Sequence, residues 1–239
     1  NKTSVKLQSA PMKIAHDLLP LILYSISLYA TPIISNNAIH HPVVGKYGMV
    51  ATQERHATQV GLNILKQGGN AIDAAVAIGF TLAVTHPQAG NLGGGGFMMI
   101  HIASENRTIA LDFRETAPKN AHKHMFLNST GNVDTQLSRF SLQSSGVPGS
   151  VHGLLTALND FGSMPRKKVI QPAIKLAKGG IIVSNELSNS LKRAKKRLIK
   201  DPTIRPIFYP NNNALDTGDK LIQKDLAKSL KRISKHGKA

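Results

Sequence analysis

The sequence predicts an α+β fold in which helices pack on a mainly antiparallel sheet. Two stretches with helical character, residues 54–67 and 71–84, come first. Two apolar or alternating runs, 97–102 and 108–114, follow them, and the short polar stretch 103–107 between these runs is typical of a hairpin. Because a glycine-rich turn leads from the helices into this hairpin, we expect the helices to cover an antiparallel sheet.

The first expected element is a buried strand over residues 48–52, a short apolar run that ends in a polar residue. The helix over 54–67 has apolar side chains at helical spacing, and Gly68 and Gly69 mark its end. Asn70 is suited to cap the second helix. That helix is apolar almost all round, so it must be buried on several sides.

One charged residue, Asp73, stands in this apolar helix. It is either a catalytic carboxylate or a first-turn carboxylate satisfied by free backbone N–H groups and the helix dipole, and we favour the second interpretation. Pro87 ends the helix, and the glycine run 93–96 lets the backbone approach a neighbour closely. No phosphate-binding motif accompanies the run, so we expect tight backbone packing there.

The second half of the chain is predicted to be mainly helical and to carry most of the excess positive charge. Pro172 is expected in the first turn of one helix, and Ser184 is suited to cap another. Residues 202–216, rich in Pro and Asn, are expected to form a loop. The helices are expected over residues 148–160, 169–178, 185–199 and 224–235.

The chain of 239 residues has a net charge of +17. Such a charge indicates either a polyanionic partner (nucleic acid, anionic lipid or an acidic protein) or a solvated basic surface. The basic runs 192–193 and 195–197 contain no interleaved aromatic residues, so we expect no specific nucleic-acid partner. The absence of Cys excludes disulfides, thiolate metal sites and a Cys nucleophile.

Metal and serine-nucleophile sites find little support in the sequence. The His40–His41 pair and the His122/His124 pair have no HExxH motif or suitably spaced carboxylates beside them, so we expect no metal. No GxSxG elbow is present, and no evident base accompanies the serines at 144–145.

The N-terminal part has the features of a targeting segment. Residues 1–11 are expected to be a non-structural upstream segment, and residues 12–38 a signal peptide or N-terminal anchor with a short charged lead and an apolar core at 18–30. This apolar core is short and is interrupted by Pro20, so we expect no stable membrane span. A periplasmic or secreted location follows as a hypothesis.

Arg114 is the candidate binding residue. It lies at the end of the second hairpin strand, where a planar guanidinium is suited to hold a carboxylate in a bidentate pair. The alternative is a structural ion pair with Glu115 or Asp112. Residue chemistry alone leaves both interpretations open.

The stretches GNAIDAAVA, PQAGNLGGGGF and DFRETAP, followed by SGVPGSVHGLLTALNDFG, occur here in an order and spacing that resemble the γ-glutamyltranspeptidase family. The resemblance covers residues 43–239, which match the N-terminal part of the large subunit. It implies the αββα sandwich of N-terminal-nucleophile hydrolases, incomplete in this chain. It also implies that Arg114 binds the α-carboxylate of glutathione or another γ-glutamyl amide, and that no metal or organic cofactor is needed.

The resemblance further implies a proenzyme that cuts itself into a large and a small subunit. A Thr that opens the small subunit is the family nucleophile, and its α-amino group is the base. No Thr-Thr-His stretch occurs here, so we expect no catalytic residue in this chain. Three alternatives stay open: a truncated large subunit whose small subunit is supplied separately, an inactive relic, or a basic binding module.

The missing nucleophile gives a direct test. A polypeptide of this sequence alone is expected to release no product from a γ-glutamyl anilide, because acyl transfer needs the Thr hydroxyl. The measurement is the absorbance of the released aniline, and turnover above background by the pure chain contradicts the expectation.

Overall fold

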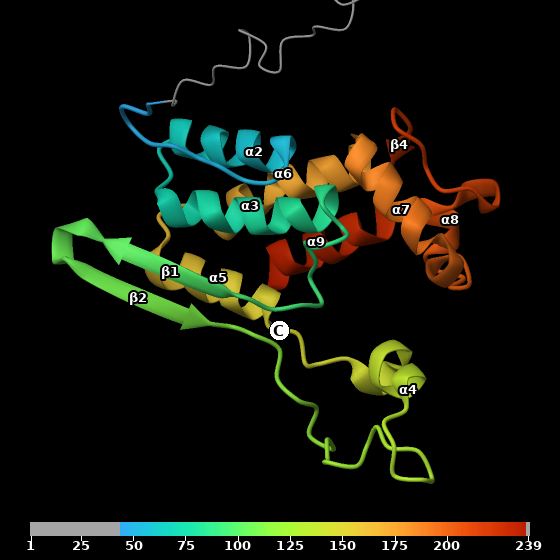
Figure 1. Cartoon of the computed structure of the whole chain (residues 1–239). Helices are drawn as coiled ribbons and strands as arrows, with labels where there is room; N and C mark the ends of the chain where they lie inside the picture. The colour runs from blue at the N-terminus through green and yellow to red at the C-terminus, as the bar shows by residue number, and fades with distance from the viewer. Residues whose placement is uncertain (1–43, 238–239) are drawn as a thin grey trace, which may run out of the picture. The chain divides into compact units, whose positions relative to one another are not determined.

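The computed structural model describes residues 44–237, and from Tyr47 onward these form one compact unit (Figure 1). The unit is mainly helical, with two small antiparallel sheets. The helices are α2 (Arg55–Lys66), α3 (Ala71–Thr85), α4 (Thr135–Phe140), α5 (Ser150–Phe161), α6 (Arg166–Gly179), α7 (Asn185–Leu198), α8 (Arg205–Phe208) and α9 (Lys224–His236). The strands are β1 (Phe97–Ile102), β2 (Arg107–Asp112), β3 (Ile181–Ile182) and β4 (Lys220–Leu221), and short 3-10 turns are η2 (Ala103–Glu105), η3 (Leu142–Ser144) and η4 (Pro210–Asn212).

The first two helices form where the sequence predicts them, and side chains cap both. The Glu54 carboxylate accepts hydrogen bonds from His56 N and Ala57 N at the start of α2. At the start of α3 the Asn70 side chain accepts from two backbone N–H groups, while the Asp73 carboxylate accepts from Asn70 N at 2.8 Å. This reciprocal capping box fixes the entry into α3.

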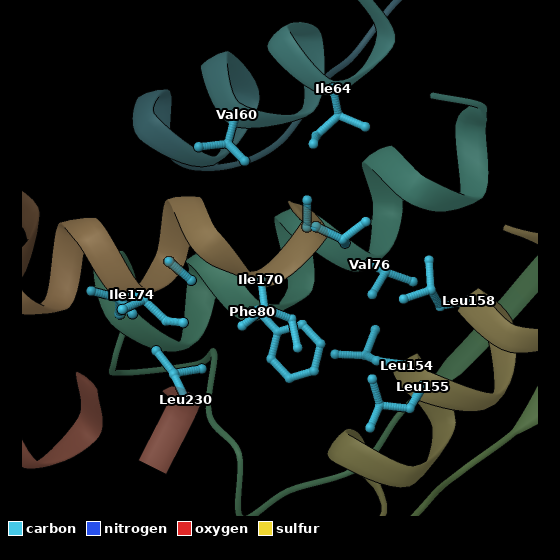
Figure 2. Close-up of a cluster of buried hydrophobic side chains, with 14 of the residues drawn as sticks. Val60, Ile64, Val76, Phe80, Leu154, Leu155, Leu158, Ile170, Ile174 and Leu230 are labelled. Atoms are coloured by element: carbon cyan, nitrogen blue, oxygen red, sulfur yellow. The ribbon is translucent and has the colours of Figure 1, made fainter. Parts of the chain in front are cut away.

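Helix α3 is the centre of the main hydrophobic core. It packs against α2, α5 and α6, and α6 in turn packs against α9. In Figure 2 the Phe80 ring lies among Leu154, Ile170 and Leu230, which come from three other helices. Gly79 allows α5 to approach, since a Cβ there would lie 2.9 Å from the Leu154 side chain. The expectation that this apolar helix is buried on several sides is confirmed.

A second cluster of buried apolar residues lies around α7, α8, β3 and β4. Its largest member is Tyr209, which is fully buried and whose hydroxyl donates to the carbonyl of Leu191 at 2.9 Å. The Pro and Asn content predicts a loop over residues 202–216. The structure instead places α8, η4 and the buried Tyr209 within this segment. The Asp201 carboxylate accepts from Thr203 N and Ile204 N, which starts the turn into α8.

The hairpin is confirmed, with β1 and β2 paired antiparallel from Phe97↔Asp112 to Ile102↔Arg107. Its two faces differ. Ile100 is buried and Met98 packs against the main core, whereas Phe97 and Met99 on the other face are 67% and 70% exposed. Within the described part of the chain, β1 and β2 pair only with each other, so the expected sheet is two-stranded here.

Two predicted elements differ from the structure. Residues 48–52 form no strand, since no described segment pairs with them. Helix α6 begins at Arg166, before the predicted start at 169, so Pro172 lies inside the helix and not in its first turn. The missing N–H removes one helical hydrogen bond, and burial of the neighbouring Ile170 and Ala173 holds the helix together across that point.

The remaining helices, α5, α7 and α9, agree with the predicted ranges to within a few residues, and Ser184 caps α7 by accepting from Leu187 N. No helix between residues 44 and 237 is long and apolar enough to cross a membrane. The predicted upstream segment 1–11 and the predicted signal or anchor 12–38 lie outside the described residues.

Candidate functional site

Arg114 follows the second hairpin strand by two residues. The ladder continues one pair beyond β1 and β2, because Phe113 N donates to Gly96 O at 3.0 Å and Gly96 N donates to Phe113 O at 3.4 Å. Arg114 is therefore the first residue after the last hydrogen-bonded pair of the hairpin. Its own N–H donates to the Asp112 carboxylate at 3.0 Å, which directs the backbone as it leaves the strand.

The glycine run packs directly on the backbone of this segment. A Cβ on Gly95 would lie 2.6 Å from Phe113 O, 2.8 Å from the Cα of Arg114 and 2.7 Å from Glu115 N. Only a residue without a side chain fits at that distance. The expectation of tight backbone packing at the glycine run is confirmed, and the packing partner is the segment that carries Arg114.

Residues 146–150 hold the same segment from another direction. Thr116 and Val147 form an antiparallel bridge, with Val147 N donating to Thr116 O at 2.9 Å. The N–H groups of Gly149 and Ser150, at the start of α5, both donate to Gly94 O, at 2.8 and 2.9 Å. The first N–H groups of α5 thus bind a backbone carbonyl of the glycine run, which joins the glycine run, the segment after β2 and the start of α5 in one unit.

Phe113 fills the space beside two glycines at the start of α5. A Cβ on Gly149 would overlap its carbonyl oxygen, and a Cβ on Gly153, one turn into α5, would overlap its ring. Both glycines therefore leave the space that Phe113 fills. The position of Arg114 is set by the packing of its neighbour, and its own side chain is not needed to hold it.

The Arg114 side chain is exposed. Among residues 44–237, no ion pair includes its guanidinium, and the carboxylate of Asp112 binds the backbone N–H of Arg114 instead. The alternative of a structural ion pair with Glu115 or Asp112 is therefore not supported. A fixed backbone with an uncommitted guanidinium is suited to hold a carboxylate from outside the described chain, with little reorganisation.

Asp73 has the structural role that the sequence favours. It is fully buried and accepts hydrogen bonds from Ser163 Oγ at 2.6 Å, Met164 N at 3.0 Å and Ser163 N, besides the one from Asn70. Burial by itself raises its pKa, but these hydrogen bonds outweigh burial and hold the pKa below the ordinary value of 3.8. An ionised carboxylate with all its acceptor positions used is unsuited to proton transfer.

The other candidates from the sequence gain no support as catalytic groups. In the described part of the chain, no group of His, Asp and Glu side chains is arranged to hold a metal, and this part includes His122 and His124. His40 and His41 lie outside it. Ser144 Oγ donates to the carbonyl of Ser141 at 2.7 Å, which is a local turn contact and not a nucleophile–base pair.

The sequence identifies Arg114 and the glycine run, but it does not predict that Gly146–Ser150 closes on them. The signal for this was the small-residue stretch around Gly149, which by itself also fits an ordinary helix start. The site that results is an exposed guanidinium on a backbone held by the glycine run and by residues 146–150.

The chain is similar to known proteins over most of its length. Residues 57–239 match the family model for γ-glutamyltranspeptidase. The glutathione hydrolase proenzyme of Escherichia coli (strain K12) is 50% identical over 200 residues, which cover 83% of this chain and 34% of that protein. The chain thus spans about a third of the length of this curated relative.

Two solved structures share the fold. The crystal structure of Helicobacter pylori γ-glutamyltranspeptidase superposes with a TM-score of 0.80 at 43% identity, covering 82% of this chain and 56% of that one. The γ-glutamyltranspeptidase of Pseudomonas nitroreducens, solved in complex with L-DON, superposes with a TM-score of 0.75 at 39% identity. The match covers 81% of this chain and 56% of that one. The expected fold class, an incomplete N-terminal-nucleophile hydrolase sandwich, is confirmed.

Proposed function

The chain belongs to the γ-glutamyltranspeptidase family, and on that basis we propose that it supplies the carboxylate anchor of an enzyme that cleaves glutathione and other γ-glutamyl amides. The γ-glutamyl group passes to water or to an amino acid or peptide. The observation that carries this proposal is Arg114, an exposed guanidinium without an ion pair in residues 44–237, on a backbone held from two sides.

In this mechanism Arg114 holds the α-carboxylate of the γ-glutamyl group through two parallel N–H···O bonds. A Thr hydroxyl oxygen attacks the γ-carbonyl carbon, the amide C–N bond breaks, and the hydroxyl proton passes through the α-amino base to the leaving amine. Water or an acceptor amine then cleaves the ester. The printed sequence contains no Thr-Thr-His stretch, so the nucleophile is assigned to a small subunit formed from the same precursor.

The exposed face of the hairpin is the surface we assign to the rest of that enzyme. Phe97 and Met99 lie next to each other on it at 67% and 70% exposure, and both outer edges of the β1–β2 pair are open in the described chain. Open edges and a large apolar face are what an added strand or sheet layer covers. This arrangement supports completion of the hairpin into a larger sheet by the catalytic part.

Processing and location complete the proposal. The relative from Escherichia coli is named a proenzyme, and we assign the same two-subunit maturation to the protein that contains this chain. The apolar run at 18–30 after Met12 and Lys13 supports export to the periplasm or outside the cell.

Replacing Arg114 with lysine tests the anchor directly. In an active protein that contains this chain and the nucleophile, Arg114→Lys is expected to raise KM for a γ-glutamyl anilide by about 10- to 100-fold, because one ammonium replaces a bidentate fork. Since the anchor binds substrate and transition state alike, kcat should change less. Steady-state kinetics over a range of substrate concentrations measure both.

A matched control lies on the same hairpin. Arg107→Lys changes a guanidinium that pairs with Glu105 at 2.7 Å on the exposed turn, and KM should stay within about twofold. An unchanged KM for Arg114→Lys removes this residue from the site. An equal rise for both variants assigns the effect to the fold of the hairpin.

A further inference from the structure

A basic groove lies between α4 and α7, away from the hairpin. Its volume is about 680 Å³. Four of the side chains that line it are cations, and none is a carboxylate. The lining residues, called here the α4–α7 groove, are Gln136, Phe140, Ser190, Arg193, Ala194, Lys196, Arg197 and Lys200.

The spacing of these residues along the chain places the cations on one side of α7. Ser190, Arg193 and Arg197 are spaced three and four residues apart, so they share the face of α7 that meets α4. The Arg197 guanidinium carbon lies 5.6 Å from the centre of the Phe140 ring, which ties the end of α4 to α7 through a cation–π contact. Two helices that are far apart in sequence therefore form the groove together.

The nearby carboxylates do not neutralise the groove. Asp216 binds Lys192 at 2.6 Å and also accepts from Ser188. The Asp201 carboxylate accepts hydrogen bonds from the N–H and hydroxyl groups of Thr203 and from the N–H of Ile204, in the turn into α8. No ion pair of the described residues includes Arg193, Arg197 or the groove lysines.

Exposed apolar side chains adjoin the cations. Phe140 is 50% exposed, and Leu142, two residues farther along the chain in η3, is 93% exposed. Cations beside protruding apolar groups are what binding to a charged lipid interface requires, since the cations meet the headgroups and the apolar groups enter the acyl boundary. A single-stranded nucleic acid would instead need faces for base stacking, and one face of the Phe140 ring is occupied by Arg197.

We propose that the α4–α7 groove, with Leu142 beside it, docks the protein on a membrane surface rich in anionic lipids. The occupant is a lipid headgroup bearing a phosphate or carboxylate, and the groove binds it through Arg193, Arg197 and the two lysines. This docking is independent of γ-glutamyl chemistry, because no groove residue is part of the Arg114 anchor.

The test is flotation of the purified chain, without the apolar run 18–30 that export would remove, with phosphatidylcholine vesicles, with and without phosphatidylserine. The patch variant changes Arg193, Lys196, Arg197 and Lys200 to glutamine. Each cation near an anionic surface contributes roughly fivefold to binding, so this variant should bind phosphatidylserine vesicles more than about a hundredfold more weakly. The matched control changes Lys167, Lys168, Lys175 and Lys178 of α6 to glutamine; these side chains are also exposed, and the loss of net charge is the same.

Selective loss in the patch variant, with the control close to the parent chain, supports the proposal. Equal loss in both variants overturns it, because net charge alone then explains the binding. Flotation with pure phosphatidylcholine that equals flotation with phosphatidylserine also overturns it, as does binding to duplex DNA or RNA with no binding to vesicles. Circular dichroism of both variants checks that they fold.

A second variant tests the apolar part. Leu142→Ser should weaken vesicle binding by about tenfold, and the residual binding should still fall when salt rises from about 0.1 M to about 1 M, as screening predicts. Met99→Ser, at an exposed apolar position on the hairpin, should leave binding unchanged. An equal loss of vesicle binding in Leu142→Ser and Met99→Ser contradicts a specific role of Leu142.

Discussion

Replacing Asp73 with asparagine is expected to lower the free energy of unfolding by about 3–5 kcal/mol. The two carboxylate oxygens accept from the N–H groups of Asn70, Ser163 and Met164 and from the Ser163 hydroxyl. Asparagine keeps one oxygen and turns an NH₂ donor toward these donors. Because Asp73 is fully buried, no water replaces the lost acceptor.

Urea denaturation followed by circular dichroism measures this loss. Asp225→Asn is the matched control, since Asp225 is also a first-turn carboxylate but is 80% exposed and pairs with Lys228 on the surface. Its effect should stay below about 1 kcal/mol. A loss below about 1 kcal/mol for Asp73→Asn contradicts the structural role of this carboxylate.

The same residue gives the stability a defined dependence on pH. The folded-state pKa of Asp73 lies below 3.8, the ordinary value for an unfolded chain. Its ionised form therefore stabilises the fold fully above that value, and this contribution is lost as the pH falls through the folded-state pKa. The difference in stability between the parent chain and Asp73→Asn should shrink as the pH falls below about 4. A difference that stays constant as the pH falls from about 4 through the folded-state pKa contradicts this linkage.

Replacing Gly149 with alanine is expected to cost about 3 kcal/mol or more and to displace Arg114. The new methyl group would overlap the carbonyl oxygen of Phe113, which belongs to the backbone and has no rotamer by which to move away. Relief requires residues 113–114 to move away from α5, which breaks the close packing on the glycine run. In an active protein that contains this chain, a shift of about 1 Å at the anchor can cost roughly a hundredfold in kcat/KM.

Gly93→Ala is the control for this substitution, because it adds the same methyl group within the glycine run. The nearest atom to a Cβ at Gly93 is Asn91 Oδ1 at 4.0 Å, so stability should change by less than about 1 kcal/mol. Thermal melts and steady-state kinetics of both variants make the comparison. Equal behaviour of the two variants contradicts the idea that Phe113 sets the position of Arg114.

The sequence by itself determined the family, most helix ranges and the side-chain caps of α3 and α7. The helix ranges and the caps depend on contacts between residues close in the chain. Asn70 reaches N–H groups two and three residues away, and Ser184 reaches Leu187. The hairpin followed for the same reason, since four residues link its strands and the alternation of apolar side chains is local.

The strand predicted over 48–52 shows where local reasoning fails. An apolar run becomes a strand only when another strand pairs with it, and no described segment does so. Pro172 shows the reverse case: a local rule placed it in the first turn, whereas burial of the residues around it lets α6 begin earlier and run past it.

Only the tertiary structure decided which donors Asp73 binds and how the backbone at Arg114 is held. Ser163 and Met164, the donors that make Asp73 structural, come from 90 and 91 residues farther along the chain. The guanidinium of Arg114 is uncommitted because the neighbouring Asp112 binds a backbone N–H instead. Its backbone is held because a glycine directly before α5 leaves the room that Phe113 needs. The sequence shows which groups are present, but which carboxylate meets which donor depends on contacts between distant segments, and only packing sets those.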